Sequence, residues 1–236
     1  MASEAPSSRI DTREVLKPER RAGVLLHITS LPGSFGIGEI GREARRFVDV
    51  LRQMQLSVWQ FLPLGPTAYG DSPYQPLSSF AGNEMLIDTE ALIDAGYLGA
   101  DEVDELTKLP EDHVDYGALI PIKKRLLALA ASRFDEMADA QTRADFEYFV
   151  AAHDAGWLND YALFRILKAR HDLRPWPEWQ PEYVHREPTA LAELEASTAA
   201  DIRKFKIEQF WFHSQWQQLK AYANARDIRI IGDIPI

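Results

Sequence analysis

The chain has 236 residues, enough for one large domain or two small ones. A hydrophobic content of 46% supports a packed core. A formal net charge of −10 argues against nucleic acid as a partner, because an acidic surface repels phosphate groups. The sequence contains no cysteine, which excludes disulfides and thiolate metal sites and fits a cytoplasmic location.

The beginning of the chain mixes acids with bases and lacks the apolar core of a signal peptide. We therefore expect an N-terminal arm over residues 1–21. The longest apolar stretch, "LLALAA" at 126–131, is far shorter than the roughly 20 residues that a membrane span requires. The sequence accordingly predicts no membrane partner.

Three segments are typical of buried parallel strands, at 23–31, 57–64 and 228–236. Each is a short apolar run without clean alternation, as expected when both faces of a strand are covered. Segment 40–55 lies between the first two and predicts a helix, because its apolar residues recur on one face. These residues are Ile40, Ala44, Phe47, Val48, Leu51 and Met54.

A second long helix should lead into the third strand, and Thr198 with Asp201 resembles a capping box at its start. Its apolar residues Ile207, Phe210, Trp211, Leu219 and Tyr222 fall on or near one face. The order strand, helix, strand, helix, strand predicts a parallel α/β core.

The segment between the second and third strands is mostly helical. Its predicted helices are a short one that stops near Gly96, one with Pro121 in its first turn, and two further helices over 141–153 and 157–171. The last of these should bury Leu158, Tyr161, Phe164 and Leu167 on one side. A link rich in Trp and Pro at 174–183 should be an ordered loop without regular helix.

These elements divide the chain into three parts. We expect the α/β core over 22–83 and 199–236, interrupted by a helical insertion over 84–198. The chain stops at Ile236 on an apolar strand, which would present an unpaired edge, and closing a barrel takes eight strands. We therefore expect the natural protein to continue beyond this point.

The loop after the second predicted strand carries an unusual set of side chains, "YGDSPYQ" at 69–75. Gly70 permits unusual backbone angles, Asp71 can form an Asx-turn, and Pro73 pushes Ser72 towards extended geometry. The result is a stiff loop that aims Tyr74. A sugar ring could lie on that aromatic face while its hydroxyls bind Ser72 and Asp71. The alternative is that Asp71 caps the turn and Tyr74 fills a gap.

Other strand ends carry weaker indications. Asp233 follows the third strand and could orient a substrate hydroxyl, or it could simply form a turn. His27 lies in the first predicted strand, where a hydrogen-bonded core role is more common than catalysis. The glycines at 33, 36 and 38 have the wrong spacing for a dinucleotide loop. No His, Asp or Glu cluster has metal-ligand spacing, so no metal site is expected.

Five stretches together resemble the amylomaltases, the 4-α-glucanotransferases of glycoside hydrolase family 77. They are "HITSLPGSFGIGEIG", "WQFLPLGPTAYGDSPYQPLSSFAGNEMLID", "VDYGALIPIKKRLL", "DYALFRILKA" and "IRIIGDIPI". The resemblance implies the first three strands of a (β/α)₈ TIM barrel, with a long helical insertion between the second and third strands. It also implies transfer of α-1,4-glucan segments between maltooligosaccharides with retention, which requires two carboxyl groups about 5–5.5 Å apart. The resemblance implies neither a metal nor an organic cofactor.

The resemblance also assigns residues. Tyr74 matches the tyrosine that stacks on glucose at the cleavage site, Ser72 lies in the same loop and contacts that sugar, and Asp233 matches a supporting aspartate that is not the nucleophile. The nucleophile and the acid/base are expected beyond Ile236, so no catalytic residue is expected here and the isolated chain should be inactive. Two alternatives remain open, a non-catalytic glucan-binding fragment and a related α-glucan hydrolase. The oligomeric state is not predicted.

Overall fold

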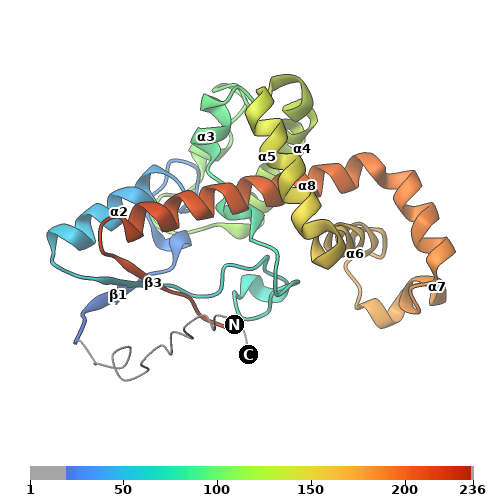
Figure 1. Cartoon of the computed structure of the whole chain (residues 1–236), viewed down its shortest axis with the longest axis horizontal. Helices are drawn as coiled ribbons and strands as arrows, with labels where there is room; N and C mark the ends of the chain where they lie inside the picture. Colours follow the sequence, from blue (N-terminus) through green and yellow to red (C-terminus); the bar gives the residue numbers. More distant parts are fainter. Residues whose placement is uncertain (1–19, 235–236) are drawn as a thin grey trace, which may run out of the picture.

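The structure is a computed structural model that describes residues 20–234. Three short parallel strands form one sheet in the order β1-β2-β3, with β1 at Gly23–Leu25, β2 at Val58–Gln60 and β3 at Arg229–Ile231 (Figure 1). The prediction of parallel strands separated by helices is therefore confirmed. Most of the predicted arm at 1–21, and residues 235 and 236 of the third predicted strand, lie outside the described residues.

The helices fall into two groups. Helix α2 (Arg42–Gln53) connects β1 to β2, and the very long α8 (Pro188–Asn224) leads into β3. Between β2 and α8 lie α3 (Thr89–Asp94), α4 (Tyr116–Met137), α5 (Ala140–His153), the π-helix η5 (Asp154–Leu158), α6 (Asn159–Arg170) and α7 (Pro181–Val184). Single 3₁₀ turns connect them: η1 (Ile28–Ser30), η2 (Tyr69–Asp71), η3 (Glu84–Leu86), η4 (Leu106–Lys108) and η6 (Trp176–Glu178).

Each strand spans three residues and is shorter than predicted. After β1 the chain turns into η1, where the Ser30 N–H donates to the His27 carbonyl at 3.0 Å. After β2 one further ladder bond forms, from the Phe61 N–H to the Ile231 carbonyl at 3.2 Å, and Pro63 then has no N–H to donate. The apolar residues beyond the strands therefore belong to loops at their carboxyl ends.

The two faces of the sheet differ. Val24, Trp59 and Ile230 are register partners that pack into the apolar core, and α2 and α8 lie on one side of the sheet (Figure 1). On the opposite face Leu25 is 58% exposed and Ile231 is 45% exposed. The expectation of strands covered on both faces is therefore wrong for β1 and β3, because both layer helices pack on the same side.

Helix α2 confirms the predicted apolar face with one exception. Ala44, Val48 and Leu51 are buried, and Phe47 packs edge-on against Trp59 with ring centroids 5.0 Å apart. Met54, also predicted on this face, is 62% exposed. Met54 is the C-cap residue, where the helix ends and its periodicity no longer fixes the side-chain direction.

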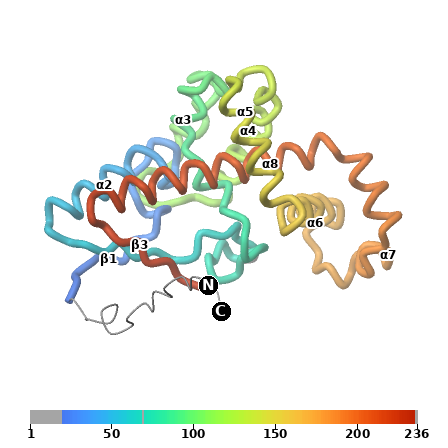
Figure 2. The backbone as a smooth tube through the Cα atoms, viewed as in Figure 1, coloured from blue at the N-terminus to red at the C-terminus, as the bar shows by residue number. Residues whose placement is uncertain are grey.

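Helix α8 begins ten residues before the predicted start at Thr198. Pro188 occupies its first turn, and Thr198 lies inside the helix with non-helical angles, φ −129° and ψ 20°. The Thr198 hydroxyl donates to the Leu194 carbonyl at 2.6 Å, a local bond that competes with the helical ladder. No capping-box hydrogen bond forms at Thr198, but a kink at this residue divides α8 into two helical stretches (Figure 2), so the predicted helix start coincides with that break.

The inserted helices agree with the sequence in part. The positive φ of Gly96, +76°, ends the α3 segment as predicted. Helix α4 begins at Tyr116, capped by Asp115, so Pro121 is its sixth residue rather than part of its first turn. Link 174–183 contains the 3₁₀ turn η6 and the start of α7, so the expectation of no regular helix is also wrong.

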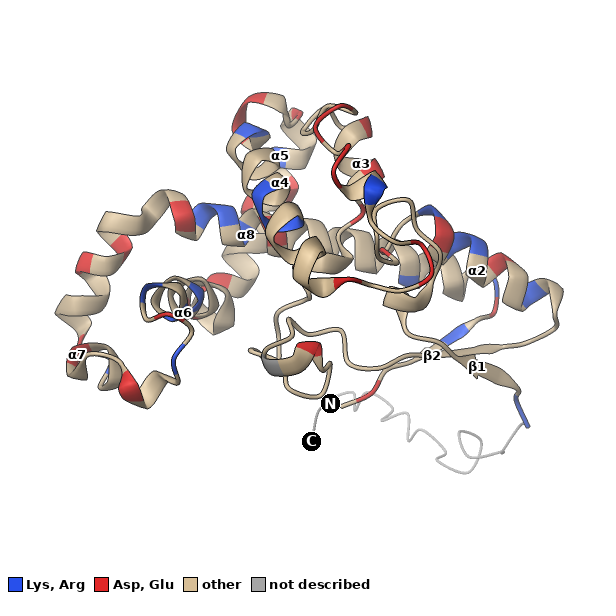
Figure 3. Cartoon of the chain, turned by 180° about the vertical axis from the view of Figure 1, so that it is seen from behind, with Lys and Arg blue, Asp and Glu red and all other residues tan. Residues whose placement is uncertain are grey.

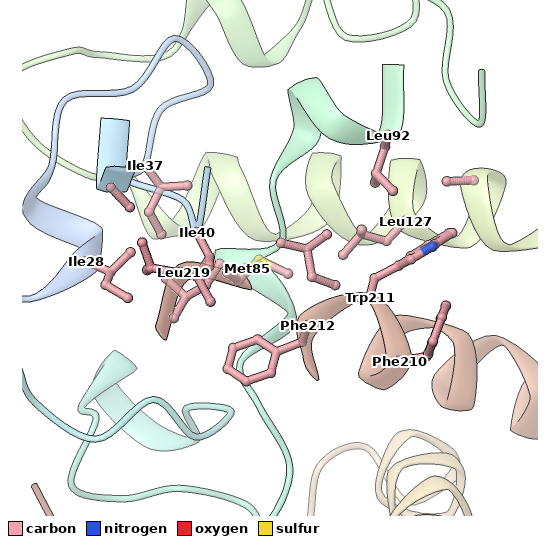
Figure 4. Close-up of a cluster of buried hydrophobic side chains, with 14 of the residues drawn as sticks. Ile28, Ile37, Ile40, Met85, Leu92, Leu127, Phe210, Trp211, Phe212 and Leu219 are labelled. Atoms are coloured by element: carbon pink, nitrogen blue, oxygen red, sulfur yellow. The ribbon is translucent and has the colours of Figure 1, made fainter. Parts of the chain in front are cut away.

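One apolar cluster joins the sheet to the helices. It runs from the β1 region through η3 and α4 to α8, as the side chains of Ile28, Met85, Leu127 and Trp211 show (Figure 4). A smaller cluster lies between α6 and the first half of α8. It contains Leu167, and Leu158 and Tyr161 are also buried as predicted. The division at residues 83/84 and 198/199 stays a prediction.

Charges of both signs lie close together on the helices. Arginines and acidic residues are interspersed along α2, whereas along α8 Glu193, Glu195 and Asp201 precede the bases Arg203, Lys204 and Lys206 (Figure 3). None of the helices in the part of the chain that the structure describes is long and apolar enough to cross a bilayer.

Candidate functional site

The loop after β2 is closed on itself by backbone hydrogen bonds. The Ala68 N–H donates to Gln75 at 3.1 Å, and the Leu77 N–H donates to Pro66 at 2.8 Å. At the tip Gly70 and Asp71 both have positive φ, 67° and 53°. Because a non-glycine residue adopts such angles at a cost, the tip conformation is held by its closure rather than by local preference.

The cap of this loop comes from Ser72. Its Oγ accepts from the Tyr74 N–H at 3.3 Å, and Ser72 itself is extended at φ −74° and ψ 126°, as Pro73 predicts. Asp71 was expected to form the turn, but its side chain makes no hydrogen bond with another described residue. The rigidity predicted for the loop is therefore supplied by the serine next to it.

The loop brings Tyr74 to the end of the third strand. Its Oη donates to Asp233 Oδ2 at 2.7 Å, and Asp233 Oδ1 accepts from the Ile234 N–H at 2.8 Å. The hydrogen bond to Asp233 raises the pKa of Tyr74, so the phenol stays protonated and donates. Tyr74 is 39% exposed, which leaves its ring accessible. Two residues 159 positions apart thus meet at the carboxyl edge of the sheet.

Asp71 lies on another side of the same loop, towards α4. Burial raises the pKa of Tyr116, the first residue of α4, and the negative charge of Asp71 raises it further. Tyr116 is also hydrogen-bonded to Thr29 in η1. The sequence did not single out Tyr116, because nothing in its local pattern links the start of α4 to the strand ends.

His27 differs from its prediction. Burial lowers the pKa of His27 to about 4, so the ring is neutral near pH 7. Its Nδ1 is buried without a hydrogen-bond partner among the described residues. The expected hydrogen-bonded core histidine is therefore not seen at this nitrogen.

A pocket of about 410 Å³ lies next to Asp233. Its walls come from the end of β2, from segment 79–82, from α5 and η5, and from one face of α8. The aromatic residues among them are Phe61, Phe80, Phe149, Trp157, Phe212 and Trp216. Of these residues, only Phe80 has a signal in the sequence, because it is an aromatic residue within a polar loop. The other five lie in apolar segments and have the pattern of ordinary core residues. No group of three His, Asp or Glu residues within 20–234 could hold a metal ion.

The chain is similar to known proteins over most of its length. The family model described as 4-alpha-glucanotransferase (Glyco_hydro_77) matches residues 26–236. A 4-alpha-glucanotransferase of Thermus thermophilus is 45% identical over 217 residues, covering 92% of this chain and 42% of the relative. The chloroplastic/amyloplastic 4-alpha-glucanotransferase of Solanum tuberosum is 36% identical over 222 residues, covering 92% of this chain and 38% of the relative.

A solved structure has the same fold. The amylomaltase from Streptococcus agalactiae in complex with acarbose superposes with a TM-score of 0.84 at 36% identity, covering 91% of this chain and 43% of that one. The chain thus spans about two fifths of the length of the proteins that it matches, with 42% for the Thermus relative. The match over 26–236 and the shared fold establish that this chain belongs to the 4-α-glucanotransferase family, glycoside hydrolase family 77.

Proposed function

We propose that this chain forms part of the glucan site of an enzyme that transfers α-1,4-glucan segments between maltooligosaccharides. The observation that carries the proposal is the hydrogen bond from Tyr74 to Asp233, which joins the ends of β2 and β3. In parallel α/β proteins, ligands bind at the carboxyl ends of the strands. Family membership supplies the reaction class.

The side chains suit a glucose ring. The half-exposed ring of Tyr74 offers a flat face for the apolar side of a pyranose, and its orientation is fixed by Asp233. The carboxylates of Asp233 and Asp71 and the hydroxyl of Ser72 can accept or donate hydrogen bonds to sugar hydroxyls. In this role Asp233 supports the site and does not attack the sugar.

The bond-breaking groups come from elsewhere in the protein. A retaining transfer needs a carboxylate nucleophile and an acid/base about 5–5.5 Å apart, and a sugar hydroxyl instead of water opens the intermediate. We infer that both carboxylates belong to segments beyond Ile236. This inference is supported by the share of the Thermus relative that the chain covers, 42%. The chain alone is then expected not to turn glucan over.

The test is incubation of the natural protein that carries this chain with maltotriose. Transfer should yield both glucose and longer maltodextrins, whereas a hydrolase would only shorten the substrate. The change Tyr74→Ala should lower kcat/KM roughly tenfold or more, since about 1.4 kcal/mol of lost transition-state binding corresponds to a factor of ten.

Tyr148→Ala is the matched control, because Tyr148 is 78% exposed on α5 and does not line the pocket beside Asp233. It should leave kcat/KM unchanged. Absence of any product from the wild-type protein would contradict the proposed activity. Equal losses in Tyr74→Ala and Tyr148→Ala would contradict the role of Tyr74.

A further inference from the structure

The pocket beside Asp233 has aromatic walls and an exposed aromatic edge. Phe80 is 72% exposed and stacks on Trp157 with ring centroids 6.3 Å apart and an interplanar angle of 21°. A large aromatic ring left in water at the rim of a pocket gains free energy when a flat apolar surface covers it. The Phe80–Trp157 pair is therefore a surface suited to one face of a sugar ring.

Both rings are held in place. The Ser78 Oγ accepts from the N–H groups of Phe80 and Ala81, each at 3.1 Å, which fixes the turn that presents Phe80. Trp157 lies in the π-helix η5, and its Nε1 donates to His153 Nδ1 at 3.4 Å. Single π-helical turns inside helical segments occur frequently at functional sites. The protein's own hydrogen bonds therefore hold both rings of the Phe80–Trp157 pair.

Polar groups lie around the same pocket. Ser79, His213 and Gln217 line it, and none of their side chains makes a hydrogen bond with another residue within 20–234. Burial lowers the pKa of His213, and the charge of His153 lowers it further. The His213 ring is therefore neutral near pH 7 and offers one hydrogen-bond donor and one acceptor. The hydroxyl, amide and imidazole groups can form hydrogen bonds with the hydroxyl groups of a pyranose, and the aromatic rings can contact its apolar face.

The pocket is also continuous with the site described above. Asp233 lines it and accepts the hydrogen bond from Tyr74. Its volume of about 410 Å³ lies within the range of small-molecule pockets, ≈ 300–1,000 Å³. A glucan chain on Tyr74 therefore has a second aromatic surface in the pocket that Asp233 also lines.

We propose that the Phe80–Trp157 pair, with Gln217 and His213, forms a further subsite that binds another glucose ring of a long α-1,4-glucan. This inference rests on the proposed function, since it concerns the same substrate class. It assigns a role in chain-length preference: substrates too short to reach the pair gain nothing from it, and longer ones bind more tightly. Phe80 is then a specificity-determining residue and takes no part in bond cleavage.

The test compares KM for maltoheptaose and maltotriose in the natural protein that carries this chain. Phe80→Ala should raise KM for maltoheptaose roughly three- to tenfold, the range for loss of one aromatic contact, with KM for maltotriose and both kcat values unchanged. Gln217→Ala, at an exposed position, should shift KM in the same direction. Tyr148→Ala is the control and should change neither KM.

The outcomes are distinguishable. If Phe80→Ala and Gln217→Ala leave both KM values unchanged in an active protein, the subsite does not exist, for example because a protein segment fills the pocket. Equal increases for the two substrates would also overturn the inference, because they would show a general loss of binding. A wild-type protein that turned over neither substrate would instead contradict the proposed function, and the inference with it.

Discussion

At the scale of single residues, the contacts that Tyr74 makes at the strand ends cannot be predicted from the residues next to it in the sequence. The phenol of Tyr74 is fixed by a carboxylate from β3 and its backbone by the hydroxyl of Ser72. Asp71 shapes the loop through its backbone, with a positive φ of +53°, and its side chain does not cap the turn. The stiff loop was predictable from Gly70 and Pro73, whereas the partner of Tyr74 was not, because Asp233 is 159 residues away.

A second group of residues is buried between η3, α6 and α8. Arg165 donates to Glu84 Oε1 at 2.7 Å and to the Tyr161 hydroxyl at 2.6 Å. Glu84 Oε2 is buried without a partner among the described residues. Burial raises the pKa of Glu208 to about 8, and the negative charge of nearby Glu84 contributes to the increase. Glu208 is therefore protonated at neutral pH.

This burial predicts a pH dependence. Because the pKa of folded Glu208 is about 8 against a reference of 4.5, its contribution to stability is fully present below pH 4.5 and is lost as pH rises through 8. Glu208→Gln keeps the group neutral, so the Tm of the variant should exceed that of the wild type by an amount that grows between pH 4.5 and about 8 and levels off above it. Differential scanning calorimetry across that range measures the difference.

Glu111→Gln provides the control, since Glu111 is exposed and makes no side-chain hydrogen bond with a described residue. Its Tm difference from the wild type should stay flat with pH. A flat difference for Glu208→Gln as well would show that Glu208 is ionised in the folded protein.

At the scale of elements, a buried ion pair ties the strand-end loops to the inserted helices. Lys123 of α4 donates to Glu39 Oε1, to the Met85 carbonyl at 2.8 Å and to the Ile87 carbonyl at 2.9 Å. Glu39 also accepts from the Thr89 N–H at 2.9 Å. The side chain of Lys123 is 1% exposed and that of Glu39 is 8% exposed. All three ammonium protons are used, so α4 is joined to the loop after β1.

Removing one partner should be costly. Lys123→Met leaves the Glu39 carboxylate buried without its cation, and we expect the free energy of unfolding to fall by about 3–5 kcal/mol in urea titration. The double change Lys123→Met with Glu39→Gln should recover part of that loss, because no buried charge remains. A loss below about 1 kcal/mol for Lys123→Met would mean that water reaches Glu39.

The comparison pair for this experiment lies nearby on the surface. Arg42 of α2 bonds Glu90 of α3 at 2.5 Å, with the two side chains 70% and 39% exposed. Arg42→Met should cost no more than about 1 kcal/mol, because solvent screens exposed ion pairs. The contrast between the two pairs separates the effect of burial from that of charge.

At the scale of the whole molecule, the sheet has one covered and one open face within residues 20–234. In the described part of the chain β1 and β3 each pair only with β2, so both are edges. Leu25, Ile231 and Ile234 are exposed at 58%, 45% and 77%. Unpaired edges that carry apolar side chains favour association between molecules.

The isolated 236-residue chain should therefore self-associate and melt without a sharp transition. Analytical ultracentrifugation and calorimetry measure these two properties. Leu25→Lys together with Ile231→Lys should reduce association, whereas Leu173→Lys, at a position 70% exposed but away from the sheet, should not. A monomer with a sharp cooperative melt would contradict the prediction.

The sequence by itself determined which segments form the strands, most of the helices and the sugar-compatible loop. Apolar periodicity located α2 and the buried side of α6, and Gly96 marked the end of α3. Glycine, proline and serine at 70–73 predicted a stiff loop. These features depend on steric limits and periodicities that act over a few residues, so they can be read locally.

The tertiary structure decided where the strands end, where α8 bends and which side chains meet. The kink at Thr198, the buried Lys123 and the Phe80–Trp157 pair all lie in segments whose local pattern suggests something else. Each depends on contacts between residues far apart in the chain, such as Lys123 with Glu39 at a separation of 84. Local propensity does not encode those contacts; packing into a shared core selects them, and the candidate site exists only once they are made.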